Sequence, residues 1–158
     1  MNREMKKWLA IGLAAIFCMG AAACGGKSSG KQPAAAEVVK AVAAQMSFSD
    51  TMSEGEQSMF TARYEIDAAL LEDQALYVGT LATADELMVM KLKDQKDVQA
   101  AKDAISAHLE DQKFAFETYI PEEMPKIENA VVLTNGNYVL LAVAADTSKV
   151  EETFKAQF

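Results

Sequence analysis

The chain has 158 residues, and 51% of them are hydrophobic, which is enough for a packed core and excludes wholesale disorder. From Ala34 onward it carries ten Lys or Arg against twenty-two Asp or Glu, a net charge of −12. Because nucleic-acid phosphates repel a domain this acidic, we expect no nucleic-acid partner.

The first 23 residues predict an export signal. Residues 1–7 hold three basic side chains and one acid, and residues 8–23 contain no charge. A basic start, an apolar run and small residues at the end are the layout of a secretory signal. The run is short for a permanent transmembrane helix, which needs about 20 apolar residues. We therefore expect residues 1–23 to be a signal peptide that is removed.

Ala21-Ala22-Ala23-Cys24 follows the apolar run and resembles the lipobox of bacterial lipoproteins. The resemblance implies diacylglycerol on the Cys24 sulfur and cleavage between Ala23 and Cys24. The third position before the cysteine is usually a larger aliphatic residue, and here it is Ala21. The three alanines also satisfy the A-x-A site of ordinary signal peptidase, and cleavage by that enzyme would leave Cys24 as a free thiol. We favour lipidation, because it accounts for the single cysteine that remains after Cys18 is removed with the signal.

Lipidation of Cys24 predicts a protein anchored to the cell membrane on its extracytoplasmic face. Two acyl chains give a stable anchor, whereas one gives a marginal one. One remaining cysteine excludes an internal disulfide and cysteine-ligated zinc, and we expect no cofactor. Residues 24–33 have the composition of a flexible Gly/Ser/Lys tether, and residues 34–158 have the length of a single domain.

The first half of this domain predicts a helix and then a polar loop. Apolar residues from Val38 to Met46 recur at helical spacing and predict an amphipathic helix of about three turns. Residues 47–58 are polar and predict a loop. A calcium loop that began at Asp50 would need oxygen ligands at its third and twelfth places, which are Met52 and Thr61, so we do not favour one.

Residues 59–66 are ambiguous, and we interpret them as a short strand or extended arm. Asp67 is expected to cap one helical turn, and strands are predicted at 75–81 and 86–92. The second strand is apolar on both faces, with Leu87 and Val89 on one and Met88, Met90 and Leu92 on the other. This predicts a central strand that is covered on at least part of each face.

The longest regular element is a helix of about six turns after Asp94, its expected N-cap. Its apolar stripe steps by three or four residues, through Val98, Ala101, Ile105, Leu109, Gln112, Phe116 and Tyr119. Pro121 is expected to end the helix. The two prolines of the segment 121–125 predict a rigid, extended crossing.

Two apolar β runs, 128–134 and 137–145, flank Asn135-Gly136 and predict a hairpin with a type I′ turn. In that register Thr134 opposes Asn137. A final helix, capped by Asp146 or Thr147, is expected to dock its apolar residues Val150, Phe154 and Phe158 on the core.

These elements together predict an α+β fold. Its antiparallel sheet would hold two hairpins and at least four strands, with the long central helix and the N- and C-terminal helices packed on one face.

Residues 34–158 resemble a family of exported lipoproteins from Gram-positive bacteria, known as domain of unknown function 4358. The resemblance rests on Ala84-Asp85-Glu86-Leu87 leading into a strand, on the helix with Gln112 and Phe116 that ends at Tyr119-Ile120-Pro121, and on the Asn-Gly-Asn-Tyr-Val hairpin. It implies the architecture and the location at the cell envelope. It implies no activity.

The sequence offers few residues for catalysis or metal binding. His108 is the only histidine, with Asp111 three residues later, but neither a nucleophile nor an orienting partner is visible, so we favour a histidine on the helix surface. Met88 and Met90 have the spacing of a soft Cu(I) pair, and core packing is the more economical interpretation.

Two pairs of adjacent acids, Asp85-Glu86 and Glu122-Glu123, do not match an acid/base pair, because neighbouring side chains on a strand point to opposite faces. We therefore predict a protein without enzymatic activity.

Three functions follow from these observations. We favour a non-catalytic lipoprotein domain that docks on another envelope protein, with an exposed apolar or aromatic patch that includes Phe48 or Phe114. The alternative is a small-ligand or solute-binding lipoprotein, which requires a pocket of several hundred cubic ångströms. A hydrolase is the third and the least supported.

Overall fold

The computed structural model describes residues 30–80 and 82–158. The predicted signal peptide, the cleavage site at Ala23 and the lipidation site at Cys24 lie outside the described residues. Among the described helices, none is both long enough and apolar enough to cross a membrane.

The described residues form five strands and five α-helices. The helices are α1 (Ala35–Ala43), α2 (Gln57–Tyr64), α3 (Val98–Tyr119), α4 (Met124–Glu128) and α5 (Val150–Lys155). The strands are β1 (Ser53–Glu54), β2 (Leu71–Val78), β3 (Glu86–Leu92), β4 (Val131–Asn135) and β5 (Tyr138–Val143). Short 3₁₀ turns stand at Ala68–Leu70, Gln95–Asp97 and Pro121–Glu123.

The five strands form one antiparallel sheet in the order β1-β2-β3-β5-β4, which confirms the predicted α+β class. The predicted strand 86–92 has the bounds of β3, and it lies in the middle of the sheet. Every residue of β3 and β5 is buried. The apolar pattern on both faces of β3 therefore did indicate a central strand covered on both sides.

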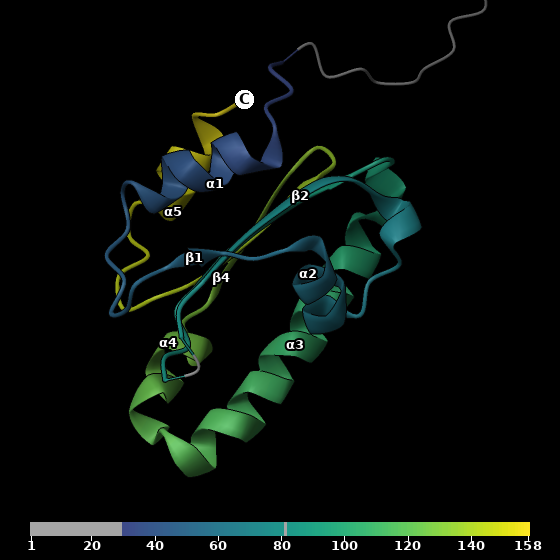
Figure 1. Cartoon of the computed structure of the whole chain (residues 1–158). Helices are drawn as coiled ribbons and strands as arrows, with labels where there is room; N and C mark the ends of the chain where they lie inside the picture. Colours follow the sequence, from purple (N-terminus) through teal and green to yellow (C-terminus); the bar gives the residue numbers. More distant parts are fainter. Residues whose placement is uncertain (1–29, 81) are drawn as a thin grey trace, which may run out of the picture.

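Helices cover both faces of the sheet, so the expectation that they share one face is wrong (Figure 1). α2, α3 and the start of α4 pack with Met88, Met90 and Leu141 on one face. α1 and α5 pack with Leu87 and Val89 on the other. Since β3 and β5 are apolar at successive positions, a single layer of helices would leave one apolar face in water.

The β4–β5 hairpin exists, but its register differs by one residue per strand from the predicted one. Asn135 pairs with Tyr138 and Thr134 with Val139, so the two turn residues are Gly136 and Asn137. Of these two turn residues only Gly136 has a positive φ, +56°, as expected of a type II′ turn rather than type I′. Asn137 is held by Leu92 of β3, whose carbonyl accepts from the Asn137 amide and whose N–H donates to the Asn137 carbonyl.

Residues 57–64 form the helix α2, although we expected a loop up to residue 58 and a short strand or extended arm over residues 59–66. Phe60 and Tyr64 lie one turn apart, and both are buried, with their rings 5.0 Å apart. The helix ends at Glu65, which takes the left-handed conformation with φ 47° although it is not glycine. The usual C-terminal signal of a helix is therefore missing from the sequence.

β2 begins at Leu71, four residues before the predicted strand. The acids Glu72 and Asp73 lie near its start, and both have partners. Glu72 pairs with Lys91 at 2.6 Å, and Asp73 accepts from the first N–H of α1, that of Ala35, at 2.7 Å. A register irregularity between Leu71 and Asp73 accommodates them.

The segment 121–125 is helical, not the extended crossing that we expected. Pro121 opens a 3₁₀ turn, and Pro125 stands in the first turn of α4. Proline is tolerated at these first helical positions because their N–H groups have no partner within the helix.

The long helix and both acidic caps agree with prediction. α3 ends at Tyr119, before Pro121, and Asp94 accepts from Lys96 N at the turn that leads into it. Asp67 accepts from Ala69 N in the same way. Val150 and Phe154 of α5 are buried, as expected.

Candidate functional site

A buried carboxylate, that of Glu86, joins the sheet to α2 and α3. Glu86 is the first residue of β3 and is 1% exposed. Tyr64 of α2 donates its hydroxyl to Oε1. His108 and Gln112, one turn apart on α3, place their Nε2 atoms 3.0 and 2.8 Å from Oε2. Three donors therefore compensate one buried negative charge.

These contacts determine the charge of the cluster. Burial raises the pKa of Glu86, but the hydrogen bond and charge of His108, together with Arg63 and Tyr64, outweigh burial and hold this pKa below its ordinary value. Burial and the neighbouring Glu86 raise the pKa of Tyr64 well above its ordinary value. Glu86 is thus ionised and accepts only, so His108 Nε2 carries a proton and donates.

Arg63 of α2 also lies beside this carboxylate. Its Nε lies 3.8 Å from Glu86 Oε1, and it makes no hydrogen bond to any residue in the ranges 30–80 and 82–158. The side chain is 27% exposed. Its remaining N–H donors therefore stay available beside the Glu86 carboxylate.

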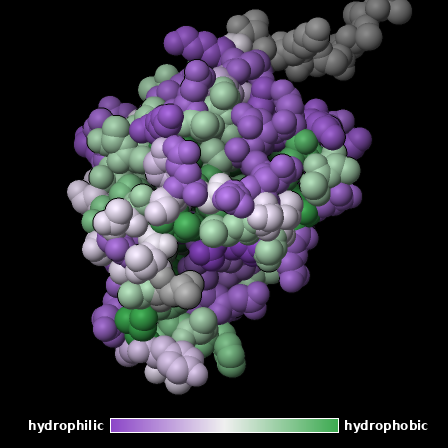
Figure 2. Space-filling model, in the orientation of Figure 1, coloured by the Kyte–Doolittle hydropathy of each residue, from purple (hydrophilic) through white to green (hydrophobic). Residues whose placement is uncertain are grey.

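A cavity of about 700 Å³ lies above this cluster, between α2, the second half of α3 and the β2–β3 connection. Its polar floor includes Arg63, Glu86, His108 and Gln112. Its apolar walls and rim include Met59, Ala62, Ala84, Ala115, Phe116 and Ile120. Tyr119, which we expected on the buried stripe of α3, is 84% exposed and stands at the rim. In Figure 2 apolar side chains are mixed with weakly polar ones at the lower end of the molecule, where α3 ends.

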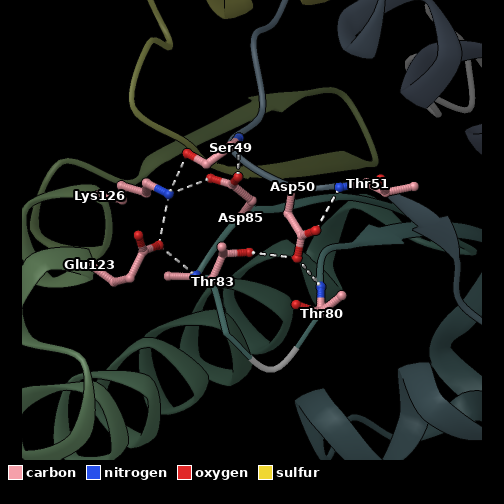
Figure 3. Close-up of polar contacts among 9 residues, drawn as sticks. Ser49, Asp50, Thr51, Thr80, Thr83, Asp85, Glu123 and Lys126 are labelled. Carbon is pink, nitrogen blue, oxygen red and sulfur yellow. Dashed lines mark hydrogen bonds and ion pairs between the residues drawn. The ribbon is translucent and has the colours of Figure 1, made fainter.

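A second polar cluster holds the wall that the β2–β3 connection forms. Asp50 accepts from Thr80 N at 2.7 Å and from the Thr83 hydroxyl at 3.4 Å (Figure 3). Glu123 accepts from Ala84 N at 2.8 Å. Asp50, which we considered as the start of a calcium loop, is therefore an anchor of this connection.

Lys126 of α4 completes the second cluster. Its Nζ lies 3.0 Å from Asp85, 2.7 Å from Glu123 and 2.8 Å from the Ser49 hydroxyl (Figure 3). Burial lowers the pKa of Lys126, but its bonds to Glu123 and Asp85 outweigh burial and raise it. The ammonium is therefore charged, and it ties α4 to the start of β3 and to the segment before β1.

The structure places the candidate residues differently from their sequence pattern. His108 is 5% exposed rather than on the surface, and its partner is Glu86, not Asp111. Met88 and Met90 are fully buried in the core under α3, as core packing requires.

The acids of each adjacent pair separate, although Glu122 and Glu123 lie in a 3₁₀ turn and not on a strand. Asp85 turns to Lys126 and Glu86 turns to α3, while Glu123 is buried and Glu122 is exposed. In the described residues no group of three or more His, Cys, Asp or Glu is arranged to hold a metal ion.

The aromatic residues expected in an exposed patch also differ from each other. Phe48 is half-buried and packs on the α1–α5 side of the sheet. Phe114 is 83% exposed on α3.

Sequence reasoning did not identify Arg63, Tyr64 or Lys126 as site residues. Their contacts join elements far apart in the chain, and residue spacing cannot show such contacts. Gln112 did leave a signal, since it was a polar residue on an apolar stripe. Glu86 left a similar one, as an acid opening an apolar strand. A polar residue at a core position indicates a buried partner.

The arrangement is suited to binding. The cavity has the volume of small-molecule sites, which is about 300–1,000 Å³, and it combines apolar walls with a few converging polar groups. In the described residues the Glu86–His108 pair makes no hydrogen bond to a serine, threonine or cysteine, and its one hydroxyl partner is that of Tyr64, which donates to Glu86.

Comparison with known proteins gives one family. The sequence model of a domain of unknown function (DUF4358) matches residues 44–144, which is more than half of the chain and includes both polar clusters. No curated protein and no solved structure matches the chain.

Proposed function

We propose that this chain, which belongs to the DUF4358 family of domains of unknown function, is a lipid-anchored, extracytoplasmic and non-catalytic binding protein. We propose further that its cavity takes a small ligand. The observation that carries the proposal is the cavity of about 700 Å³ over the Glu86 cluster. Its volume meets the requirement of the ligand-binding alternative, which is a pocket of several hundred cubic ångströms.

The walls of the cavity support this function because they are held on several sides. α2 and α3 are tied together through Glu86, and the β2–β3 connection is tied to Asp50, Glu123 and Lys126. A cavity whose walls are fixed before binding loses little conformational entropy when the ligand enters.

The position of the cavity suits a domain tethered at its N-terminus. Pro33 is held by the hydroxyl of Tyr138, which pairs with Lys91 near the end of β3. Glu86 opens β3 at its other end, about 17 Å away along the strand, and it faces the opposite helix layer. In Figure 1 α1, which follows Pro33, lies at the opposite end of the described domain from the end of α3, so a tether that leaves at Pro33 starts far from the cavity.

Blocking the cavity tests the ligand-binding function. Saturation-transfer NMR would compare a set of small apolar molecules with neutral, cationic and anionic head groups against the full chain in detergent. Ala115→Trp places a large side chain in the cavity wall on α3, and we expect binding to be lost. Ala44→Trp, an exposed change at the end of α1, serves as the matched control. Equal binding by both variants would refute the proposal.

The anchor has a separate test at Cys24. We expect Cys24→Ala to release the protein from the membrane fraction of the cells that export it, because the thioether that carries diacylglycerol has no substitute. Mass spectrometry of the native protein should show a lipid-modified Cys24 as the first residue. Unchanged membrane retention of the variant would contradict lipidation.

Docking on an envelope protein is a second candidate, and exposed Phe114 is the observation that favours it. Cross-linking on intact cells would identify a partner, and Phe114→Ala should reduce the cross-link. Lys113→Ala, the neighbouring change on the same helix, is the control. A cross-link of equal yield from both variants would contradict docking through Phe114.

A further inference from the structure

Two side chains that line the cavity have hydrogen-bonding atoms that no described residue uses. They are Gln112, through Oε1, and Arg63, through Nε, and both atoms are buried. Both side chains are neighbours of the same carboxylate, Glu86, so they lie at the same part of the floor. What they offer together limits the chemistry of the ligand.

The orientation of the Gln112 amide is fixed by its partner. Glu86 Oε2 accepts from Nε2 at 2.8 Å, and the ionised carboxylate has no proton to give. The reverse orientation would place two oxygens against each other. Oε1 is therefore an acceptor, and it is buried without a donor among the described residues. A buried acceptor without a donor destabilises the empty site.

Arg63 offers the complementary capacity. Its Nε faces Glu86 at 3.8 Å, and its other N–H donors have no partner in the described chain. The adjacent carboxylate largely compensates its charge. Arg63 therefore supplies donors to the cavity without making the floor strongly positive.

Charged head groups fit this floor poorly. A carboxylate would approach Glu86 and Asp111, both of which line the cavity of a domain with a net charge of −12. An ammonium has no acceptor to offer the N–H donors of Arg63. An uncharged group with one acceptor and one donor avoids the repulsion and matches both side chains.

We propose that the cavity binds an uncharged amide that carries an apolar side chain, as found in the backbone of a short peptide. This inference rests on the proposed ligand-binding function. The amide oxygen accepts from Arg63, the amide N–H donates to Gln112 Oε1, and the apolar side chain packs against Ala115, Phe116 and Ile120. Because the polar groups are at the floor and the apolar ones at the walls, a single amide beside one side chain satisfies both.

Four probes with the same isobutyl side chain test the head group. The neutral probe is N-acetyl-leucinamide, and the zwitterionic probe is leucine. The anionic probe is 4-methylpentanoate, and the cationic probe is 3-methylbutylammonium. Their affinities for the full chain in detergent would be measured by NMR titration. We expect the neutral amide to bind roughly tenfold more tightly than each charged probe, the effect of about one well-placed hydrogen bond.

Two matched variants test the assignment to Gln112. Gln112→Met keeps the length of the side chain and removes its oxygen, and it should weaken the amide probe by about tenfold while leaving the charged probes unchanged. Gln99→Met is an exposed change on the same helix and should have no effect. Thermal melting of both variants shows whether they are folded. If Gln112→Met is unfolded, the ranking of the four probes on the natural chain still tests whether the cavity prefers a neutral amide.

The outcomes separate this inference from the function on which it rests. A charged probe that binds as tightly as the amide, and that Ala115→Trp excludes, would overturn the amide assignment and leave the cavity as a ligand site. Probes that bind equally well to the Ala115→Trp variant would refute the ligand site itself. Failure of all four probes to bind up to their solubility limits would overturn the amide assignment.

Discussion

Replacing Glu86 by glutamine removes one buried negative charge and leaves the size of the side chain nearly unchanged. The carboxylate accepts three hydrogen bonds, from Tyr64, His108 and Gln112. Each bond to a charged group contributes about 1.5–3 kcal/mol and a neutral one about 0.5–1.5 kcal/mol, so the three together lose about 3 kcal/mol. The burial cost of the charge is relieved at the same time, which leaves a net loss of about 2 kcal/mol.

Urea unfolding measures this loss, with Glu152→Gln on the exposed side of α5 as control. A loss of about 2 kcal/mol corresponds to a melting temperature lower by roughly 5–10 °C in a domain of this size. The difference should also depend on pH. The folded pKa of Glu86 is depressed, so its contribution is complete above the ordinary glutamate pKa, about 4.3, and is lost as the pH falls through the folded value.

The natural chain and the Glu86→Gln variant should therefore become equally stable in acid. A difference that stays constant from neutral pH to below the ordinary glutamate range would refute the ionised state of Glu86. A variant as stable as the Glu152→Gln control at neutral pH would refute the whole account of the cluster.

Three further substitutions have expected effects on the free energy of unfolding in the same assay. Lys126→Met leaves two buried carboxylates without their cation and should cost about 3–5 kcal/mol. The control Lys155→Met breaks an exposed ion pair and should cost less than about 0.5 kcal/mol. Similar losses in the two variants would show that Lys126 does not form a buried ion pair. Glu65→Gly relieves a left-handed backbone at φ 47° and should stabilise the chain by about 0.5 kcal/mol, and any loss would contradict that conformation. Gly136→Ala meets no atom within 4 Å but places a side chain at φ +56°, so it should cost about 1 kcal/mol from the backbone alone, and an unchanged stability would contradict the turn.

The elements that could be predicted from the sequence are those whose packing repeats along the chain. α3 has a stripe of six turns, and β3 is apolar on both sides, so each carries its own signal. α2 carries no such signal. Phe60 and Tyr64 share a helix face, but only their contacts with α3 and the sheet make that face a buried one.

The candidate site shows the same limit. Gln112 and Glu86 were visible as polar residues at core positions, yet nothing in their spacing joins a residue of α3 to one of β3. The register of the hairpin was missed for a related reason. Leu92, on a third strand, holds Asn137 and so determines which two residues form the turn.

Tyr138 contacts both ends of the described chain, since its hydroxyl reaches Pro33 and its ring lies 4.7 Å from that of Phe158. α1 and α5 share a layer although more than a hundred residues separate them. Contacts between such distant segments close slowly, because a long loop must lose its freedom first. During the proposed export, this layer cannot close until α5 has left the secretion channel. The face of β3 and β5 that α1 and α5 cover therefore stays open until that point.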